Sequence, residues 1–200
     1  MINIAVLASG RGTNLQAIIN AVQEGKIDGT IKIVISDNEK AYALKRARDN
    51  RINTMVFPYK SYKNKENYED QIINCLKNNY IDLVVLAGYM RLLGSKIINN
   101  YRYRIINIHP ALLPSFPGLN AQKQALQYGV KISGCTVHFV DEGIDTGPII
   151  LQHAVEVKQT DNEETLSDRI LKYEHQLLPR AIQLFAKKRI TIEKNIAHIT

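Results

Sequence analysis

An amide and an imidazole stand two residues apart in the segment Ile105 to Pro114, which reads IINIHPALLP. Alternate side chains of a strand point to the same face, so we expect Asn107 and His109 to lie side by side where this apolar run ends against prolines. An amide N–H can donate to a developing oxyanion, and an imidazole can carry a proton to or from a reacting amine. A lone His is usually a satisfied core residue, but the neighbouring Asn favours a catalytic pair.

Carboxylates are supplied by a second polar segment, VDEGIDTGP (Val140 to Pro148), which contains Asp141, Glu142 and Asp145. A carboxylate beside an imidazole fixes its tautomer and stabilises its protonated form. Neither segment offers a Ser or Cys nucleophile. An amide, an imidazole and a carboxylate without a nucleophile predict direct acyl transfer, with no covalent enzyme intermediate.

A glycine-containing loop, ASGRGTNLQAI (Ala8 to Ile18), runs from an apolar segment into a helical pattern. Gly10 and Gly12 flank its turn, and backbone N–H groups at the start of the helix would hold an anion. Three side-chain donors in the loop suit a monophosphate: Ser9, Thr13 and Asn14.

The same loop allows two other interpretations. A nicotinamide dinucleotide is one, because Asp37 ends the next apolar run where a ribose-binding acid would stand, but Leu15 occupies the third glycine position of that fingerprint. In the other, the glycines only shape a tight turn.

These polar groups need a framework, and a short apolar run followed by a helical pattern recurs along the chain. The runs predict strands at Ile2 to Ala8, Ile31 to Ser36, Thr54 to Phe57, Ile81 to Ala87 and Arg104 to Ile108. Strands separated by helices imply a parallel sheet that binds ligands beyond the carboxyl ends of its strands. The sequence therefore predicts an α/β fold: a Rossmann-like, mostly parallel twisted sheet flanked by helices.

The pattern changes after His109. Ser133 to Val140 alternates like a strand, and Gly147 to Val157 follows after a short loop, which predicts an antiparallel extension in the C-terminal half. Apolar positions from Leu166 to Phe185 keep helical spacing and predict a long closing helix. We expect one domain over residues 1–200.

Composition limits the classes of protein. The chain has 200 residues, of which 45% are hydrophobic and 22% charged, as in an ordinary globular domain. No apolar segment approaches the roughly 20 residues of a membrane helix, and the first residues lack a signal peptide pattern, so we expect a cytoplasmic protein without membrane contact. Cys75 and Cys135 lack metal-site spacing, which predicts reduced packing residues and no metal site.

The formal net charge of +7 favours acidic partners. Much of it lies in KRARDNR (Lys45 to Arg51) and YKSYKNK (Tyr59 to Lys65). No nucleic-acid-binding motif accompanies these segments, which favours a solvated helix face over a nucleic-acid patch. Phosphate or carboxylate groups on small molecules fit the charge equally well.

Several segments together closely resemble the folate-dependent formyltransferases: LAGYMRLL (Leu86 to Leu93), NIHPALLPSFPG (Asn107 to Gly118) and SGCTVHFVDEGIDTGPII (Ser133 to Ile150). SGRGTN (Ser9 to Asn14) is similar to the branch whose acceptor is a small ribonucleotide. The resemblance covers approximately residues 2 to 190, and four motifs in the right order are highly specific.

The resemblance implies that the amine of glycinamide ribonucleotide attacks the formyl carbon of 10-formyltetrahydrofolate, an early step of purine synthesis that requires no metal. Asn107, His109 and Asp145 match the catalytic trio of the family. Asn107 would stabilise the oxyanion, His109 would manage the proton, and Asp145 would hold His109.

We expect residues 1–100 to form the phosphate- and ribonucleotide-binding half and residues 101–200 the catalytic and folate-binding half. The resemblance also implies individual substrate-binding residues. The ribonucleotide set is Gly12, Thr13, Asn14, Lys65, Leu171, Lys172, Tyr173 and Glu174. The folate set is Met90, Arg91, Leu92, Leu93, Asn107, Asp141, Glu142, Gly143, Ile144 and Asp145. Taken alone, Met90, Leu92 and Leu93 read as ordinary core and Glu174 as a solvent-facing helix residue. Lys65 departs from the Arg that the family commonly has there and offers a point charge instead of a bidentate fork.

Three rival functions are weighed against this one. Methionyl-tRNA formyltransferases carry an extra carboxyl-terminal tRNA domain, whereas this chain ends soon after its closing helix. Formyltetrahydrofolate hydrolases carry an extra amino-terminal domain, whereas the first strand here begins at Ile2. A dinucleotide-dependent oxidoreductase leaves Asn107 and His109 unexplained. We expect a monomer or homodimer, and we assign His138, His153, His175 and His198 to structural or surface positions.

Overall fold

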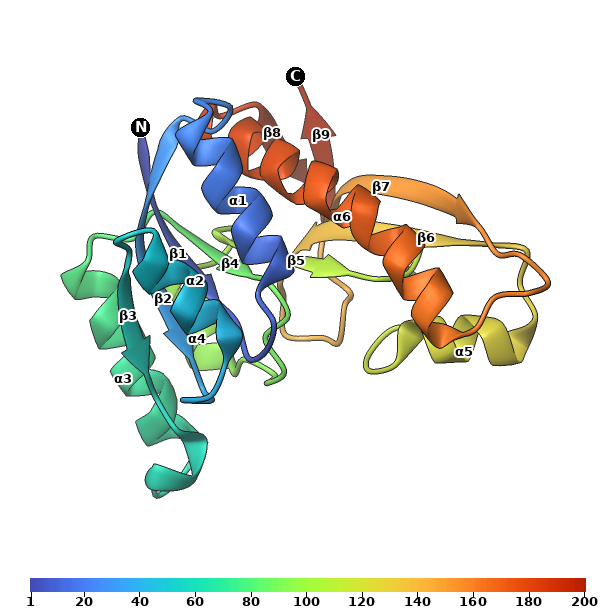
Figure 1. The fold of residues 1–200 in the computed structure, drawn as a ribbon. Helices are drawn as coiled ribbons and strands as arrows, with labels where there is room; N and C mark the ends of the chain where they lie inside the picture. Colours follow the sequence, from blue (N-terminus) through green and yellow to red (C-terminus); the bar gives the residue numbers. More distant parts are fainter.

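The computed structural model describes residues 1–200 as alternating strands and helices (Figure 1). The elements of the first half are β1 (Ile2–Leu7), α1 (Thr13–Gln23), β2 (Gly29–Ser36), α2 (Tyr42–Asp49), β3 (Asn53–Val56), the short 3₁₀ helix η1 (Tyr59–Ser61), α3 (Lys65–Asn78), β4 (Leu83–Leu86) and α4 (Ser95–Asn100). The second half holds β5 (Ile105–His109), α5 (Ala121–Tyr128), β6 (Ile132–Phe139), β7 (Ile149–Glu156), α6 (Glu163–Ala186), β8 (Ile190–Glu193) and β9 (Ile196–Ile199).

Seven strands form one sheet in the order β3-β2-β1-β4-β5-β6-β7. The five neighbouring strands β3, β2, β1, β4 and β5 pair in parallel. Strand β6 pairs antiparallel with β5 and with β7. The predicted fold class is confirmed, including the antiparallel extension, and each predicted strand ends within about two residues of its position in the structure.

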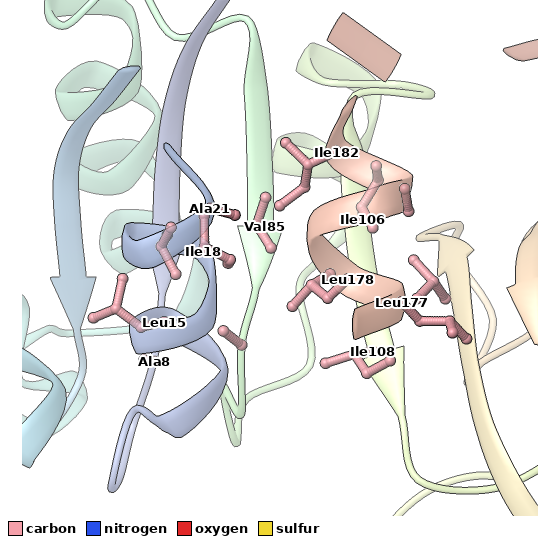
Figure 2. Packing of buried hydrophobic residues seen from close by; sticks show 14 of the residues in the cluster. Ala8, Leu15, Ile18, Ala21, Val85, Ile106, Ile108, Leu177, Leu178 and Ile182 are labelled. Carbon is pink, nitrogen blue, oxygen red and sulfur yellow. The ribbon is translucent and has the colours of Figure 1, made fainter. Parts of the chain in front are cut away.

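Helices cover both faces of this sheet. The larger core joins side chains of α1, α2 and α6 to one face, and the smaller core joins α3 and α4 to the other. Figure 2 shows Leu15 and Ile18 of α1 and Leu178 of α6 on either side of Val85, in β4. All four residues of β4 are buried, as an apolar run without alternation requires.

The helix α6 connects the two halves of the molecule. It begins with a capping box, in which the Asn162 side chain and Thr165 each hydrogen-bond to the other's backbone N–H. It then packs along β6, β7 and α1. Because α6 crosses from the antiparallel extension to α1, it can bring residues near position 174 to the loop that precedes α1.

The hairpin of β8 and β9 was not predicted. Its two central residues, Lys194 and Asn195, have φ of 47° and 66°, the positive values of a two-residue hairpin turn. The strands are four residues each and mostly exposed, so their hydrophobic pattern is weak. Cys75 and Cys135 are buried and unpaired, as predicted. None of the helices is both long and apolar enough to span a bilayer.

Candidate active site

Strand β5 places Asn107 and His109 at the carboxyl end of the parallel part of the sheet. Asn107 lies opposite Leu86 of β4 on one side and His138 of β6 on the other. His109 is the last residue of β5 and is 4% exposed. The predicted pair therefore stands at a strand end, but in a nearly dry setting in which each polar atom needs a partner.

The loop between β6 and β7 brings Asp145 to this pair. Its Oδ2 lies 3.2 Å from His109 Nδ1 and accepts the Gly118 N–H at 2.8 Å, while Asn107 Nδ2 approaches Oδ1 at 3.5 Å. Asp141 braces the same loop by accepting from Gly143 N and Thr146 Oγ1. The structure thus brings together the three side chains that the sequence predicted to act as a unit.

A fourth side chain, His138, lies in this cluster; it is buried at 2% exposure, so of the structural or surface positions expected for it the structure gives a buried one, beside the predicted trio. Its Nδ1 donates to the Phe139 carbonyl at 2.8 Å, which leaves Nε2 of the neutral ring as an acceptor. Asn107 Nδ2 lies 3.2 Å from that Nε2, and Asp145 Oδ1 lies 3.5 Å from it. His138 therefore orients the Asn107 amide.

Burial and charge act in opposite directions on this cluster. Burial lowers the pKa of His109 below its ordinary value, although Asp145 and the Phe116 carbonyl raise it. Burial raises the pKa of Asp145, but its contact with His138, the hydrogen bond from Gly118 and the charge of His109 outweigh burial and hold that pKa below its ordinary value. An imidazole of lowered pKa beside a carboxylate is suited to proton transfer.

The segment after β5 turns back over His109. Its Phe116 carbonyl accepts from His109 Nε2 at 2.8 Å, so the imidazole lies between this carbonyl and Asp145. Phe116 has a φ of 54°, in the left-handed region that bulky side chains rarely occupy. This segment therefore covers the nitrogen of His109 that faces away from Asp145.

The glycine loop opens α1 as predicted. Gly12 is the N-cap, with a φ of 69° and no side-chain cap, so the first N–H groups of the helix are left for a ligand. A Cβ at Gly12 would lie 2.7 Å from both Cα and Cβ of Ala43, whereas nothing lies within 4 Å of one at Gly10. The close approach of α2 therefore requires glycine at position 12.

Helix α6 reaches this loop through Glu174. The Glu174 carboxyl is buried and accepts from Asn14 Nδ2 at 2.7 Å. Burial raises its pKa, while the bond from Asn14 lowers it. The interpretation of Glu174 as a solvent-facing helix residue was therefore wrong. Next to it, Tyr173 stacks on His153 with ring centroids 3.8 Å apart.

The segment after β4 carries apolar side chains that the core does not use. Met90 and Leu92 are each 66% exposed, so the interpretation of both as ordinary core was wrong. Arg91 lies between them, with Nε 2.7 Å from Asp37 Oδ2 and its guanidinium over the Tyr59 ring. Because Asp37 is paired with Arg91, it is not free to bind a dinucleotide ribose.

The model of the formyl transferase family matches residues 2–182 of the chain. The chain belongs to the formyltransferase family. It is 45% identical over 183 residues to the phosphoribosylglycinamide formyltransferase of Bacillus subtilis (strain 168), covering 92% of this chain and 94% of that protein. It is 44% identical over 192 residues to the human trifunctional purine biosynthetic protein adenosine-3, of whose length it spans 19%. The glycinamide ribonucleotide transformylase 1 of Symbiobacterium toebii superposes with a TM-score of 0.98 at 49% identity, over 100% of this chain and 94% of that one.

Three residues of the ribonucleotide set, Lys65, Leu171 and Lys172, make no hydrogen bond to the glycine loop in this formyltransferase. Lys65 begins α3, where its Nζ lies 3.9 Å from Glu69 Oε1, and it makes no hydrogen bond to the loop of Gly12. Leu171 is half-buried and Lys172 is exposed, one turn from Glu174 or less. Asn14 and Glu174 are the two residues of the ribonucleotide set that the structure joins directly.

Replacing His138 with Phe in this formyltransferase should lower kcat about tenfold with little change in either KM, because the ring stays but the acceptor of the Asn107 amide is lost. Steady-state kinetics of the purified variant measure this. His198→Phe, on the exposed strand β9, is the matched control. A His138→Phe variant with the kcat of the wild type would show that His138 does not position Asn107.

Proposed function

We propose that this formyltransferase works by direct attack of an amine on the formyl carbon, with Asn107, His109 and Asp145 as the catalytic groups. The chain has phosphoribosylglycinamide formyltransferase activity, a reaction of de novo purine biosynthesis. Its acceptor is glycinamide ribonucleotide and its donor is 10-formyltetrahydrofolate. The observation that carries the mechanism is the convergence of the three side chains at the end of β5.

The proposed chemistry follows from these groups. The acceptor nitrogen attacks the formyl carbon, a C–N bond forms, and the carbonyl electron pair moves to oxygen. An Asn107 N–H donates to that oxyanion. His109 takes a proton from the attacking nitrogen and returns one to the folate nitrogen as its bond to the formyl carbon breaks. Asp145 stabilises the imidazolium that exists between these two transfers.

The substrate must reach His109 through the segment that covers it. Asp145 occupies the side of Nδ1, so Nε2 is the nitrogen left for proton transfer. In the free protein the Phe116 carbonyl holds Nε2, and the reacting nitrogen takes its place in the complex. The positive φ of Phe116 favours this exchange, because the conformation is costly to maintain.

We place the two substrates on either side of the trio. The ribonucleotide phosphate binds the N–H groups at the start of α1, and Glu174 with its neighbours Leu171, Lys172 and Tyr173 contacts the rest of that substrate. The folate lies against the exposed side chains of Met90 and Leu92 and against the loop from Asp141 to Asp145. The exposed Ile144, in that loop, adds apolar surface for the folate.

An acceptor screen tests the function. The purified protein is given 10-formyltetrahydrofolate with glycinamide ribonucleotide, with methionyl-tRNA, or with water alone, and loss of the formyl group from the folate is followed. We expect formylation of glycinamide ribonucleotide only. Transfer to tRNA, or deformylation at a comparable rate without an acceptor, would overturn the assignment.

The phosphate loop gives a separate prediction. Gly12→Ala should raise the KM for the ribonucleotide about tenfold or more, because the new Cβ meets Ala43 and a positive φ costs an alanine roughly 1–2 kcal/mol. The affinity for folate should change little. Gly10→Ala is the matched control, since its Cβ meets open space. Weakened folate binding with an unchanged ribonucleotide KM would place the wrong ligand at this loop.

A further inference from the structure

A cavity of about 910 Å³ lies between α1 and α6 and includes none of the catalytic trio. Besides these helices, its lining includes Arg46 of α2 and, near the C-terminus, Arg189 and Ile199. A cavity of this size is in the range that binds small molecules. Eleven of its sixteen lining residues carry polar or charged side chains, which favours a polar ligand.

The cavity is positively charged. Four cationic side chains line it (Lys26, Arg46, Arg180 and Arg189) against one carboxylate, that of Glu24. Glu24 is already paired with Lys26 at 2.6 Å, and Arg189 hydrogen-bonds to Thr200. Of the four cations, Arg46 and Arg180 are the two for which no such partner has been named.

These two arginines have no anionic partner in the protein. Arg46 donates only to neutral oxygens, at 2.9 Å to the Arg11 carbonyl and at 3.2 Å to Gln16 Oε1. Arg180 makes no ion pair or hydrogen bond and is exposed. Planar guanidinium groups bind phosphate through paired N–H donors, so both side chains are available to an anion in the cavity.

His175 adds an unpaired polar atom to the same cavity. It lines the cavity, and its Nε2 is buried without a hydrogen-bond partner. Burial lowers the pKa of His175, and the positive charge of Arg46 lowers it further. A buried nitrogen without a partner is unfavourable, and a ligand that supplied an oxygen there would remove that cost.

We propose that the cavity between α1 and α6 is a binding site for a small molecule with two or more phosphate groups. Arg46 and His175 hold one phosphate near Thr13, and Arg180 holds another farther along α6. The side-chain amides of Gln16, Gln176 and Gln183 line the same cavity and suit a polar remainder of the ligand. Because Thr13 belongs both to this cavity and to the start of α1, the occupant competes with the ribonucleotide phosphate; this consequence rests on the proposed function.

Calorimetric titration with inorganic tripolyphosphate and with orthophosphate tests the site directly. We expect tripolyphosphate to bind the wild-type protein about tenfold or more tighter than orthophosphate, and Arg180→Gln to weaken tripolyphosphate about tenfold. Arg48→Gln is the matched control, because Arg48 is exposed on α2, carries the same charge and does not line the cavity. It should leave the affinity unchanged.

Two results would overturn the proposal. One is equal affinity for the two anions. The other is a tripolyphosphate affinity that Arg180→Gln leaves at the wild-type value while Gly12→Ala abolishes it, which would place the anion at the loop alone. These outcomes do not depend on catalysis, so failure of the proposed function leaves the binding result intact.

A kinetic measurement tests the competition. Tripolyphosphate should raise the KM for glycinamide ribonucleotide without lowering kcat, and Arg180→Gln should remove this inhibition while it keeps the kcat and KM measured without the anion. Inhibition of the same strength in Arg180→Gln would contradict the proposal. So would inhibition that lowers kcat alone, since the two ligands would then not compete.

Discussion

Replacing Asn107 with Leu is expected to lower kcat by about 10²–10³-fold, the cost of removing one oxyanion donor from a preorganised site. Leu keeps the size of the side chain but removes the N–H groups that His138 and Asp145 orient. Because the oxyanion exists only along the reaction path, the dissociation constants of both substrates should change far less than kcat. Single-turnover kinetics and equilibrium titration of each substrate measure the two quantities separately.

The fold of the Asn107→Leu variant needs a control, because Asn107 is half-buried against β6. The far-ultraviolet circular dichroism and the thermal midpoint should stay close to those of the wild type. A second variant, Asn107→Asp, keeps the shape but replaces the donor with a negative charge, and it should be at least as slow as Asn107→Leu. If either variant kept near-normal kcat, the oxyanion would have to be held by another group.

The placement of Asn107 and His109 on one face of β5 could be predicted because it depends only on residues close together in the sequence. A strand has a period of two, so an Asn and a His two apart must share a face, and the prolines that follow fix where the strand ends. The alternation of apolar runs and helices likewise predicted the parallel sheet. These inferences require no knowledge of which strands are neighbours.

His138 was missed because its role depends on a long-range pairing. Its own strand reads as buried and regular, and a His in such a run is an ordinary core residue. Only the antiparallel register of β5 with β6 sets His138 opposite Asn107. Nothing in the spacing of the two residues along the chain specifies that register.

Glu174 illustrates the same limit on a helix. Its helical pattern alone does not tell which neighbour covers its face, and a charged residue there is most often solvated. Its burial follows from the packing of α6 on α1, which brings Glu174 to Asn14 over 160 positions of sequence. The resemblance to the formyltransferases named this residue, whereas local reasoning did not.

The dependence of His109 on Asp145 gives the last prediction. Burial already lowers the pKa of His109 below the usual value of about 6.5, and Asp145 is the largest influence that raises it again. Asp145→Asn removes that charge, so the pKa of His109 should fall further. A base with a lower pKa is deprotonated down to a lower pH but accepts a proton less readily, and the imidazolium formed during the reaction loses its partner. We therefore expect kcat to fall by about 10² or more.

A titration of the His109 ring by NMR separates this effect from others on the pH profile, since the amine of the substrate must also be deprotonated to react. The pKa should be lower in Asp145→Asn than in the wild type, and it should be unchanged in Asp141→Asn, whose carboxylate lies in the same loop but contacts Gly143 and Thr146 instead. The acidic limb of the profile of kcat should move to lower pH with the His109 pKa. If Asp145→Asn left both that pKa and kcat near their wild-type values, Asp145 would serve only to hold Gly118 and the loop in place, and the catalytic groups would reduce to Asn107 and His109.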